Sequence, residues 1–187
     1  MLDLMKYESL GAALRDALDR WPDEVCLIEA DRDREKSRLS YRQFKEAAEP
    51  LASALEDCGF TAGARAAIIM TNQPKWLISA YAVFFAGGVV VPLDYKLSAA
   101  EHLQLLSHSK AEVLFVEYPL WRAITEATEF HKHKLRVVLV CEAPPNANLA
   151  GGLRWEDFLT NHAPEFRPRT RKDAACIVYS SGTGGRP

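Results

Sequence analysis

A run of hydroxyl and glycine residues near the end of the chain is its strongest candidate for binding chemistry. An apolar stretch, Ile177-Val178-Tyr179, predicts a buried strand that leads into Ser180, Ser181, Gly182, Thr183, Gly184 and Gly185, followed by Arg186 and Pro187. Glycines allow successive backbone N–H groups to turn toward one point, and the hydroxyls and Arg186 add donors and positive charge. This pattern favours a phosphate as the bound group. Composition alone leaves a flexible Gly/Ser tail open as the alternative.

Other patterns in the sequence give weaker candidates. The run is not a Walker loop, because no Gly-Lys-Ser/Thr follows, and it is not Gly-x-Gly-x-x-Gly. His131 and His133 have no third ligand nearby, so we interpret them as part of a solvated turn. Asp94 follows a predicted strand, but such a residue is more often a turn or capping residue. We therefore assign no catalytic residue and no metal ligand from the sequence.

The elements that must position this run alternate between strand and helix from Arg65 onward. Strands are predicted at 65–70, 89–91, 112–117, 135–141 and 173–179, and helices at 72–87, 98–108, 119–130 and 154–161. These strands are apolar on both faces, which is typical of a parallel sheet that helices cover on both sides. We therefore predict an α/β fold, a three-layer sandwich with a mostly parallel sheet and right-handed crossovers.

The first 60 residues predict two helices that flank a pair of short strands. Ser9 caps a helix that ends before Pro22, strands follow at 25–28 and 38–41, and a second helix runs from Ser40 to Gly59. Pro50 lies inside that second helix, where proline removes a hydrogen bond and costs about 3 kcal/mol. We expect a kink or a break there.

Composition and charge exclude several classes of protein. The 187 residues are 48% hydrophobic and 26% charged, which excludes disordered, collagen-like and coiled-coil chains. With 23 Lys+Arg and 25 Asp+Glu, the net charge of −2 gives no basic excess for nucleic acid. Four cysteines without a CxxC pair are interpreted as buried thiols. No signal peptide is evident, and glycines and Pro92 interrupt the uncharged run 76–93, so we expect no membrane span and a cytoplasmic location.

Residues 179–187 resemble the phosphate-binding signature of the adenylate-forming (AMP-binding) superfamily, which includes acyl-CoA synthetases, peptide-synthetase adenylation domains and luciferases. That signature reads Tyr-Ser/Thr-Ser-Gly-Thr-Thr-Gly-x-Pro-Lys. The chain departs from it at Gly184, where a second Thr is usual, and stops at Pro187, before the Lys. Residues 39–44 and 85–94 resemble two further core motifs of the superfamily. Each of these two is weak alone, but the three occur in the superfamily's order, and the resemblance covers nearly the whole chain.

The resemblance implies a reaction and its partners. Members join a carboxylic acid to ATP with magnesium, giving an acyl-adenylate and pyrophosphate, and most then pass the acyl group to a thiol such as coenzyme A. The run 180–185 would hold phosphates of ATP. Residues 1–187 would form a single α/β segment, the N-terminal part of the AMP-binding lobe of an acyl- or fatty-acyl-CoA synthetase, ending inside the phosphate-binding loop. Later motifs of the superfamily normally lie beyond that loop, so we expect these residues alone not to catalyse adenylation.

Two alternatives keep the fold without the reaction. The chain would then be a standalone binding or scaffold module, or the remnant of a gene. The residues do not specify the acid or the final acceptor. Apolar sheet surface that later residues of a complete lobe would cover leads us to expect self-association.

Overall fold

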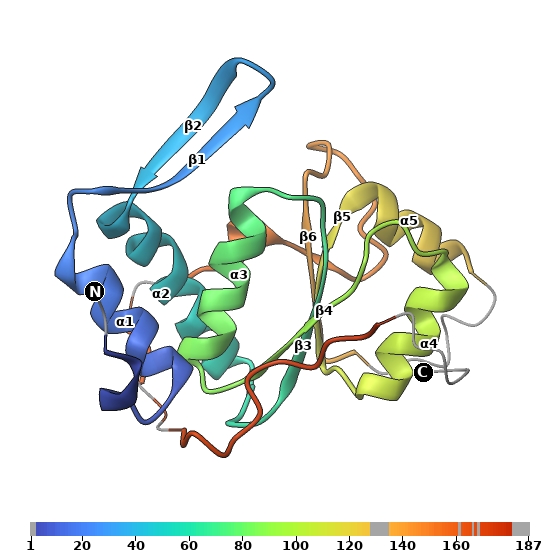
Figure 1. Cartoon of the computed structure of the whole chain (residues 1–187). Helices are drawn as coiled ribbons and strands as arrows, with labels where there is room; N and C mark the ends of the chain where they lie inside the picture. The colour runs from blue at the N-terminus through green and yellow to red at the C-terminus, as the bar shows by residue number, and fades with distance from the viewer. Residues whose placement is uncertain (1–2, 128–134, 161, 166, 168, 181–187) are drawn as a thin grey trace.

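A parallel sheet covered by helices on both faces forms the centre of the molecule (Figure 1). The computed structural model describes residues 3–127, 135–160, 162–165, 167 and 169–180. Within them, a five-stranded sheet has the order β4-β3-β5-β6-β7, and every neighbouring pair is parallel. The strands are β3 (Arg65–Ile69), β4 (Val89–Pro92), β5 (Val113–Glu117), β6 (Val137–Cys141) and β7 (Leu153–Arg154). The predicted α/β fold with a mostly parallel sheet is confirmed.

Alternate residues of the strands face two separate apolar cores, as expected of strands that are buried on both faces. Ala66 and Ile68 of β3 belong to the core that contains residues of α1, α2 and α3. Ala67 and Ile69 belong to the core that contains residues of α4 and α5. The sheet therefore separates two helical layers, which are α1 (Leu10–Arg20), α2 (Tyr41–Asp57) and α3 (Pro74–Phe85) on one face, and α4 (Ala99–Ser109) and α5 (Tyr118–Glu126) on the other.

A two-stranded antiparallel hairpin projects from the rest of the molecule (Figure 1). Its strands β1 (Val25–Asp31) and β2 (Arg34–Ser40) are longer than the sequence predicted, because charged residues between the two predicted strands pair with one another across the hairpin. Asp31 lies opposite Arg34, and the Glu29 carboxylate lies 3.9 Å from the Lys36 ammonium. Helix α2 begins directly after β2, where Ser40 forms a capping box with Gln43.

Helix α2 runs through Pro50 without a break, so that one of the two expected outcomes is wrong. The residues after Pro50 explain why the helix continues. Leu51 and Leu55 are completely buried in the core, and burying a leucine contributes about 1.5–3 kcal/mol. Two such side chains outweigh the roughly 3 kcal/mol that proline costs inside a helix.

Two other predicted elements are wrong in their extent. In place of a helix at 154–161, strand β7 is followed by a short 3-10 helix, η3 (Trp155–Asp157), because the backbone of Arg154 pairs with β6. In place of a strand at 173–179, the structure has a single parallel bridge between Cys176 and Val90. This segment has a neighbour on one side, and the Val178 side chain is 73% exposed. One more 3-10 helix, η1 (Leu4–Lys6), precedes α1.

The cysteines and the uncharged run have clear places in the fold. All four cysteines are free thiols, but Cys141 is buried whereas Cys176 is exposed, so the expectation of four buried thiols is wrong. Burial raises the pKa of the Cys141 thiol to about 12. Most of the uncharged run forms α3 and β4. Among the described residues, no helix has the length and apolar character that crossing a membrane requires.

Candidate functional site

A segment that crosses one end of the sheet carries the chain toward the predicted phosphate-binding run. We call the described residues between 160 and 173 the return segment. Hydrogen bonds from side chains to backbone carbonyls anchor this segment to the rest of the chain. Ser53 Oγ of α2 donates to the carbonyl of His162 at 2.8 Å. Arg167 donates to the carbonyl of Phe60 at 3.0 Å, and Arg171 donates to that of Tyr7 at 2.8 Å. The return segment is therefore tied both to α2 and to the N-terminal residues.

A buried carboxylate holds the middle of the return segment. The Glu56 side chain is 8% exposed, and its Oε2 accepts a hydrogen bond from the Glu165 backbone N–H at 2.9 Å. Its Oε1 lies 3.8 Å from the Arg167 guanidinium. A buried charge is tolerated where hydrogen bonds and an opposite charge stabilise it. Glu56 thus fixes the path of the chain between α2 and the edge of the sheet.

Beyond the return segment, the chain pairs with the free edge of β4. The Val90 N–H donates to the Ala175 carbonyl at 3.0 Å, and the Ile177 N–H donates to the Val90 carbonyl at 2.9 Å. Side chains alternate from here, with Ile177 and Tyr179 half-buried and Val178 exposed. This alternation is typical of an edge strand with one covered face. It packs Ile177 and Tyr179 against the core on the side of the sheet where α4 lies.

The structure describes one of the predicted phosphate-binding residues, Ser180, whose side chain is exposed. An exposed hydroxyl there fits a group that donates to a phosphate oxygen. The other predicted residues lie outside the described residues, namely Ser181, Gly182, Thr183, Gly184 and Gly185. His131 and His133 also lie outside them. In the described part of the chain, no group of three or more His, Cys, Asp or Glu side chains is arranged to hold a metal ion.

Tyr179, directly before Ser180, contacts the last turn of α4. Its hydroxyl lies 2.8 Å from Nδ1 of His108, and the two rings pack edge to face with centroids 5.7 Å apart. Burial raises the pKa of Tyr179, although the Ser109 hydroxyl and the Arg65 charge oppose this effect. The phenol therefore keeps its proton at neutral pH and can donate it to a neutral imidazole.

The sequence did not point to a second polar cluster, which lies where β3 and β5 end. Oε1 of Glu117 accepts from the Thr71 N–H at 2.6 Å, from the Thr71 hydroxyl, and from the Gln73 side-chain amide at 2.7 Å. Because β3 leads to a helix on one face and β5 to a helix on the other, this is a topological switch point, where α/β sheets commonly bind ligands. The available signal was a polar residue at the end of β5 and another shortly after the end of β3. Glu117 uses its charge to tie the two ends together.

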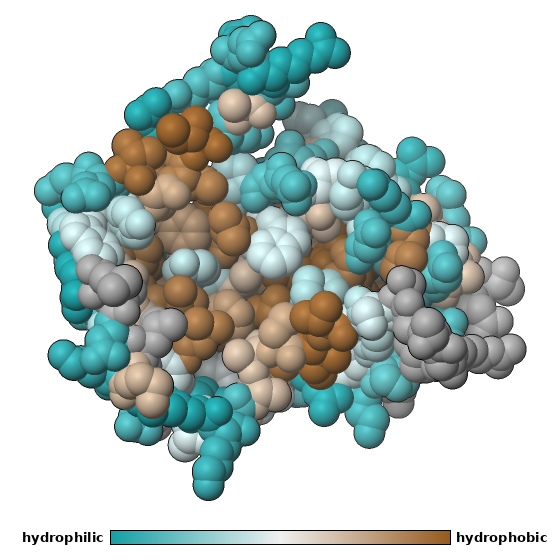
Figure 2. All heavy atoms as spheres, viewed as in Figure 1, coloured by the Kyte–Doolittle hydropathy of each residue, from teal (hydrophilic) through white to brown (hydrophobic). Residues whose placement is uncertain are grey.

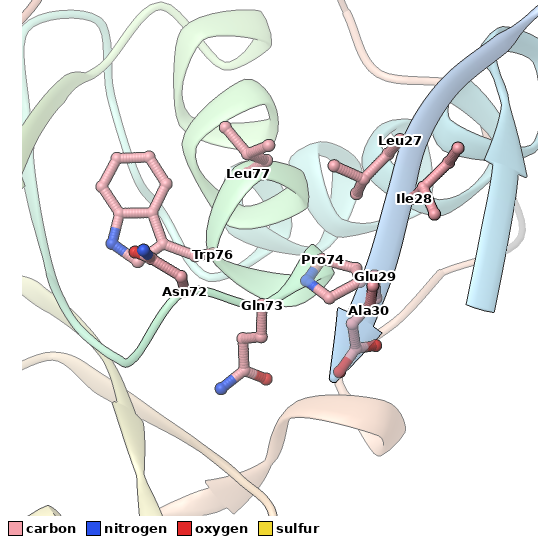
Figure 3. Close-up of a pocket in the computed structure, with 9 residues that line it drawn as sticks. All are labelled: Leu27, Ile28, Glu29, Ala30, Asn72, Gln73, Pro74, Trp76 and Leu77. Carbon is pink, nitrogen blue, oxygen red and sulfur yellow. The ribbon is translucent and has the colours of Figure 1, made fainter. Parts of the chain in front are cut away.

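Two hollows lie beside this cluster. One, of about 470 Å³, is lined partly by Asn72 and Lys75. The other, of about 460 Å³, lies between β1 and α3, where Leu27 and Leu77 stand on opposite sides (Figure 3). The charge of Lys75 is already paired, because its ammonium lies 2.6 Å from both Glu142 and Glu156. Burial alone would lower the pKa of Lys75, but the two carboxylates outweigh burial and raise it.

Asp94 has a role in a turn. Its Oδ1 accepts a hydrogen bond from the Lys96 N–H at 3.0 Å, and its carbonyl lies 2.9 Å from Nε2 of the buried His102. The side chain thus stabilises the link between β4 and α4. This agrees with the interpretation of Asp94 as a turn residue rather than a site residue.

Known proteins resemble the chain in both sequence and fold. Indoleacetate–CoA ligase from Aromatoleum aromaticum is 33% identical over 156 residues, covering 80% of this chain and 29% of that protein. A long-chain-fatty-acid-CoA ligase from Archaeoglobus fulgidus has a TM-score of 0.78 at 20% identity, covering 94% of this chain and 35% of the other. The anthranilate CoA ligase AuaEII, solved with anthranoyl-AMP, has a TM-score of 0.78 at 23% identity, covering 96% and 33%.

These likenesses differ in what they establish. At 20% and 23% identity, the two solved structures show the fold alone. The chain spans about a third of the length of each of these three relatives. A match to the family of AMP-binding enzymes extends over residues 14–187. Since this match takes in the sheet, both helical layers and the predicted phosphate-binding run, the chain belongs to the AMP-binding enzyme family.

Proposed function

We propose that this chain is the N-terminal part of the large lobe of an ATP-dependent acid–thiol ligase of the acyl-CoA synthetase type. What supports the proposal most is the family match over residues 14–187. Relatives act, by their names, on indoleacetate and on long-chain fatty acids, so the reaction type is shared while the acid differs. Carboxylic acid, ATP and coenzyme A are the proposed substrates, and the cytoplasm, where these occur together, is the proposed location.

In the proposed reaction, a carboxylate oxygen forms a bond to the α-phosphorus of ATP, and the bond from that phosphorus to pyrophosphate breaks. The sulfur of a thiol then forms a bond to the acyl carbon of the acyl-adenylate, the bond from that carbon to the AMP oxygen breaks, and AMP leaves as the thioester forms. Magnesium would offset negative charge on the phosphates. The contribution of this chain is positioning: hydroxyls of Ser180, Ser181 and Thr183 and the backbone N–H groups of the glycines would donate to phosphate oxygens. Gly184 supplies one hydroxyl fewer than the usual Thr.

Carboxylate-dependent ATP–pyrophosphate exchange by the native polypeptide that contains these residues tests the proposal. A panel of aryl, short-chain and long-chain acids should give exchange with one class, and only with magnesium. Thr183→Val should lower exchange at least about tenfold, since it removes a donor to developing phosphate charge. Thr61→Val makes the same change at an exposed turn residue and should leave exchange unchanged. Exchange that needs no acid, or release of phosphate instead of pyrophosphate, would contradict the proposal.

The same assay on residues 1–187 alone separates the proposal from a binding module. We propose that they give no exchange, because they span about a third of their relatives. Exchange by these residues alone would contradict this. The intact mass of the native polypeptide completes the test. A much longer native species supports the ligase. A native polypeptide of 187 residues that binds nucleotide without exchange would favour a non-catalytic module.

A further inference from the structure

The chain enters the predicted phosphate-binding run with little backbone support. Among the described residues, Ile177 makes the last backbone hydrogen bond to the sheet, at 2.9 Å to Val90. The next side chain, Val178, is 73% exposed and points away from the core. Tyr179 is therefore the last described residue before Ser180 that is seen to fix the chain, and it does so through its side chain.

The surface that receives Tyr179 is rigidly tied to the sheet. His108 lies in the last turn of α4, and the neighbouring Ser109 is 2% exposed. The Arg65 guanidinium, from the first residue of β3, donates to the Ser109 carbonyl at 2.6 Å. The end of α4 is thereby held against the sheet, and the hydrogen bond between His108 and Tyr179 links that position to the chain one residue before Ser180.

We propose that His108 is a positioning residue for phosphate binding. By accepting the hydrogen bond of the Tyr179 hydroxyl at Nδ1, it sets the direction in which the backbone leaves toward Ser180 and the residues that follow. His108 acts through Tyr179 and does not touch the nucleotide. The inference rests on the proposed function, because that function assigns phosphate binding to the run 180–185.

The size of the effect follows from the type of bond. A neutral hydrogen bond contributes modestly, so His108→Ala or Tyr179→Phe should weaken binding of ATP with magnesium about fivefold. Tyr179→Phe keeps the ring and removes only the donor. His108→Asn places an amide oxygen near the position of Nδ1 and should restore most of the affinity. Gln104→Ala, at an exposed position one turn earlier on α4, is the matched control.

A double-mutant cycle tests the coupling in the native polypeptide that contains these residues. ATP affinity is measured by calorimetry for the wild type, His108→Ala, Tyr179→Phe and the double variant, alongside hydrogen exchange of the Ser180 amide without nucleotide. We expect the double variant to be no weaker than either single variant, and the urea midpoint to match that of Gln104→Ala. In the native polypeptide, KM for ATP should rise while KM for the acid stays constant, which a general loss of structure would not produce.

The outcomes separate the inference from the proposed function. The inference would be overturned if the wild type binds ATP and both single variants bind it with the same affinity. Additive effects in the double variant would overturn it as well. If the wild-type native polypeptide binds no nucleotide, the proposed function fails. In that case, hydrogen exchange of the Ser180 amide still tests the contact between His108 and Tyr179. Loss of protection that is no greater in the double variant than in either single variant supports positioning, and additive losses overturn it.

Discussion

At the scale of single residues, removal of the Glu117 side chain should cost stability although it lies outside the predicted phosphate-binding run. Its carboxylate joins the end of β5 to the residues that follow β3, through Thr71 and Gln73. Glu117→Ala leaves the half-buried Thr71 N–H without its acceptor, so we expect a loss of about 2–3 kcal/mol in the free energy of unfolding, measured in urea.

The control for this prediction is a second glutamate, Glu126, which forms an exposed ion pair. The side chain of Glu126 is 69% exposed, and its carboxylate lies 3.3 Å from Arg122. Such pairs contribute little, so Glu126→Ala should change the free energy of unfolding by less than about 0.5 kcal/mol. Equal effects of the two substitutions would mean that the hydrogen bonds to Glu117 contribute no more to stability than the exposed ion pair of Glu126 does. Glu117→Gln, which keeps an acceptor oxygen, should fall between them.

At the scale of elements, crowding at a glycine should prove more costly than backbone strain. A Cβ on Gly88 would lie 2.4 and 2.6 Å from ring carbons of the buried Phe60. Gly88→Ala should therefore destabilise the chain by about 3 kcal/mol. Gly151 offers the reverse case, with φ of +87° and no atom within 4 Å of its Cβ position, so Gly151→Ala should cost about 1–2 kcal/mol through strain alone. Urea unfolding of both variants compares the two causes, and a harmless Gly88→Ala would show that Phe60 can move.

The return segment should loosen as the pH rises. The hydrogen bond to Asp57 and the bond to the Ala163 carbonyl raise the pKa of His162, against a smaller opposing effect of burial. A raised folded-state pKa means that the interaction is fully present below the unfolded value of about 6.5 and is lost as pH rises through the folded value. Protection of the Glu165 amide, corrected for intrinsic exchange, should fall between about pH 6 and 8. His162→Gln should abolish that dependence, and a pH dependence that persists in this variant would refute the assignment.

Local signals in the sequence predicted elements well, and tertiary effects explain where they failed. Ser9 caps a helix as expected, and the helices predicted to start at Ser40 and Ser98 are capped by these two serines, because a cap depends on neighbours within a single turn. The break at Pro50 was a local inference that burial in the core overrides. The strand expected at 173–179 needed a second neighbour that the described sheet does not provide. The role of Glu117 depends on β3 and β5 being neighbours in the sheet, and the residue pattern of one strand does not indicate which strand lies beside it.

At the scale of the whole molecule, the same limits apply to the site. The phosphate-binding run was predicted from its residue types together with the resemblance to adenylate-forming enzymes, and its role remains a prediction because Ser180 is its one described member. Its surroundings were not predicted. His108 precedes Tyr179 by 71 residues, so nothing in their spacing indicates that the two rings meet. The charged return segment likewise reads as a loop, although it anchors α2 to the edge of β4.

Apolar surface on one side of the molecule predicts self-association. Figure 2 shows brown patches on the face where β1, α3 and the segment after the return segment lie. Exposed apolar residues of these elements include Ile28, Val178 and Leu77, with exposed fractions of 48%, 73% and 37%. Exposed apolar patches promote association. We expect the weight-average mass of the 187-residue chain, from light scattering, to rise with concentration in the micromolar range.

Matched substitutions locate the surface responsible for association. Ile28→Lys and Val178→Lys place charges on this face and should lower the average mass toward the monomer. Leu159→Lys is the control, because Leu159 is 44% exposed but lies beside α2 and η3. If all three variants associate like the wild type, another surface is responsible, and a wild-type monomer at every concentration would refute the prediction. Association lost only on changing Ile28 or Val178 would mean that the elements flanking the predicted site also form the contact, so nucleotide binding should then be measured on the monomeric variants.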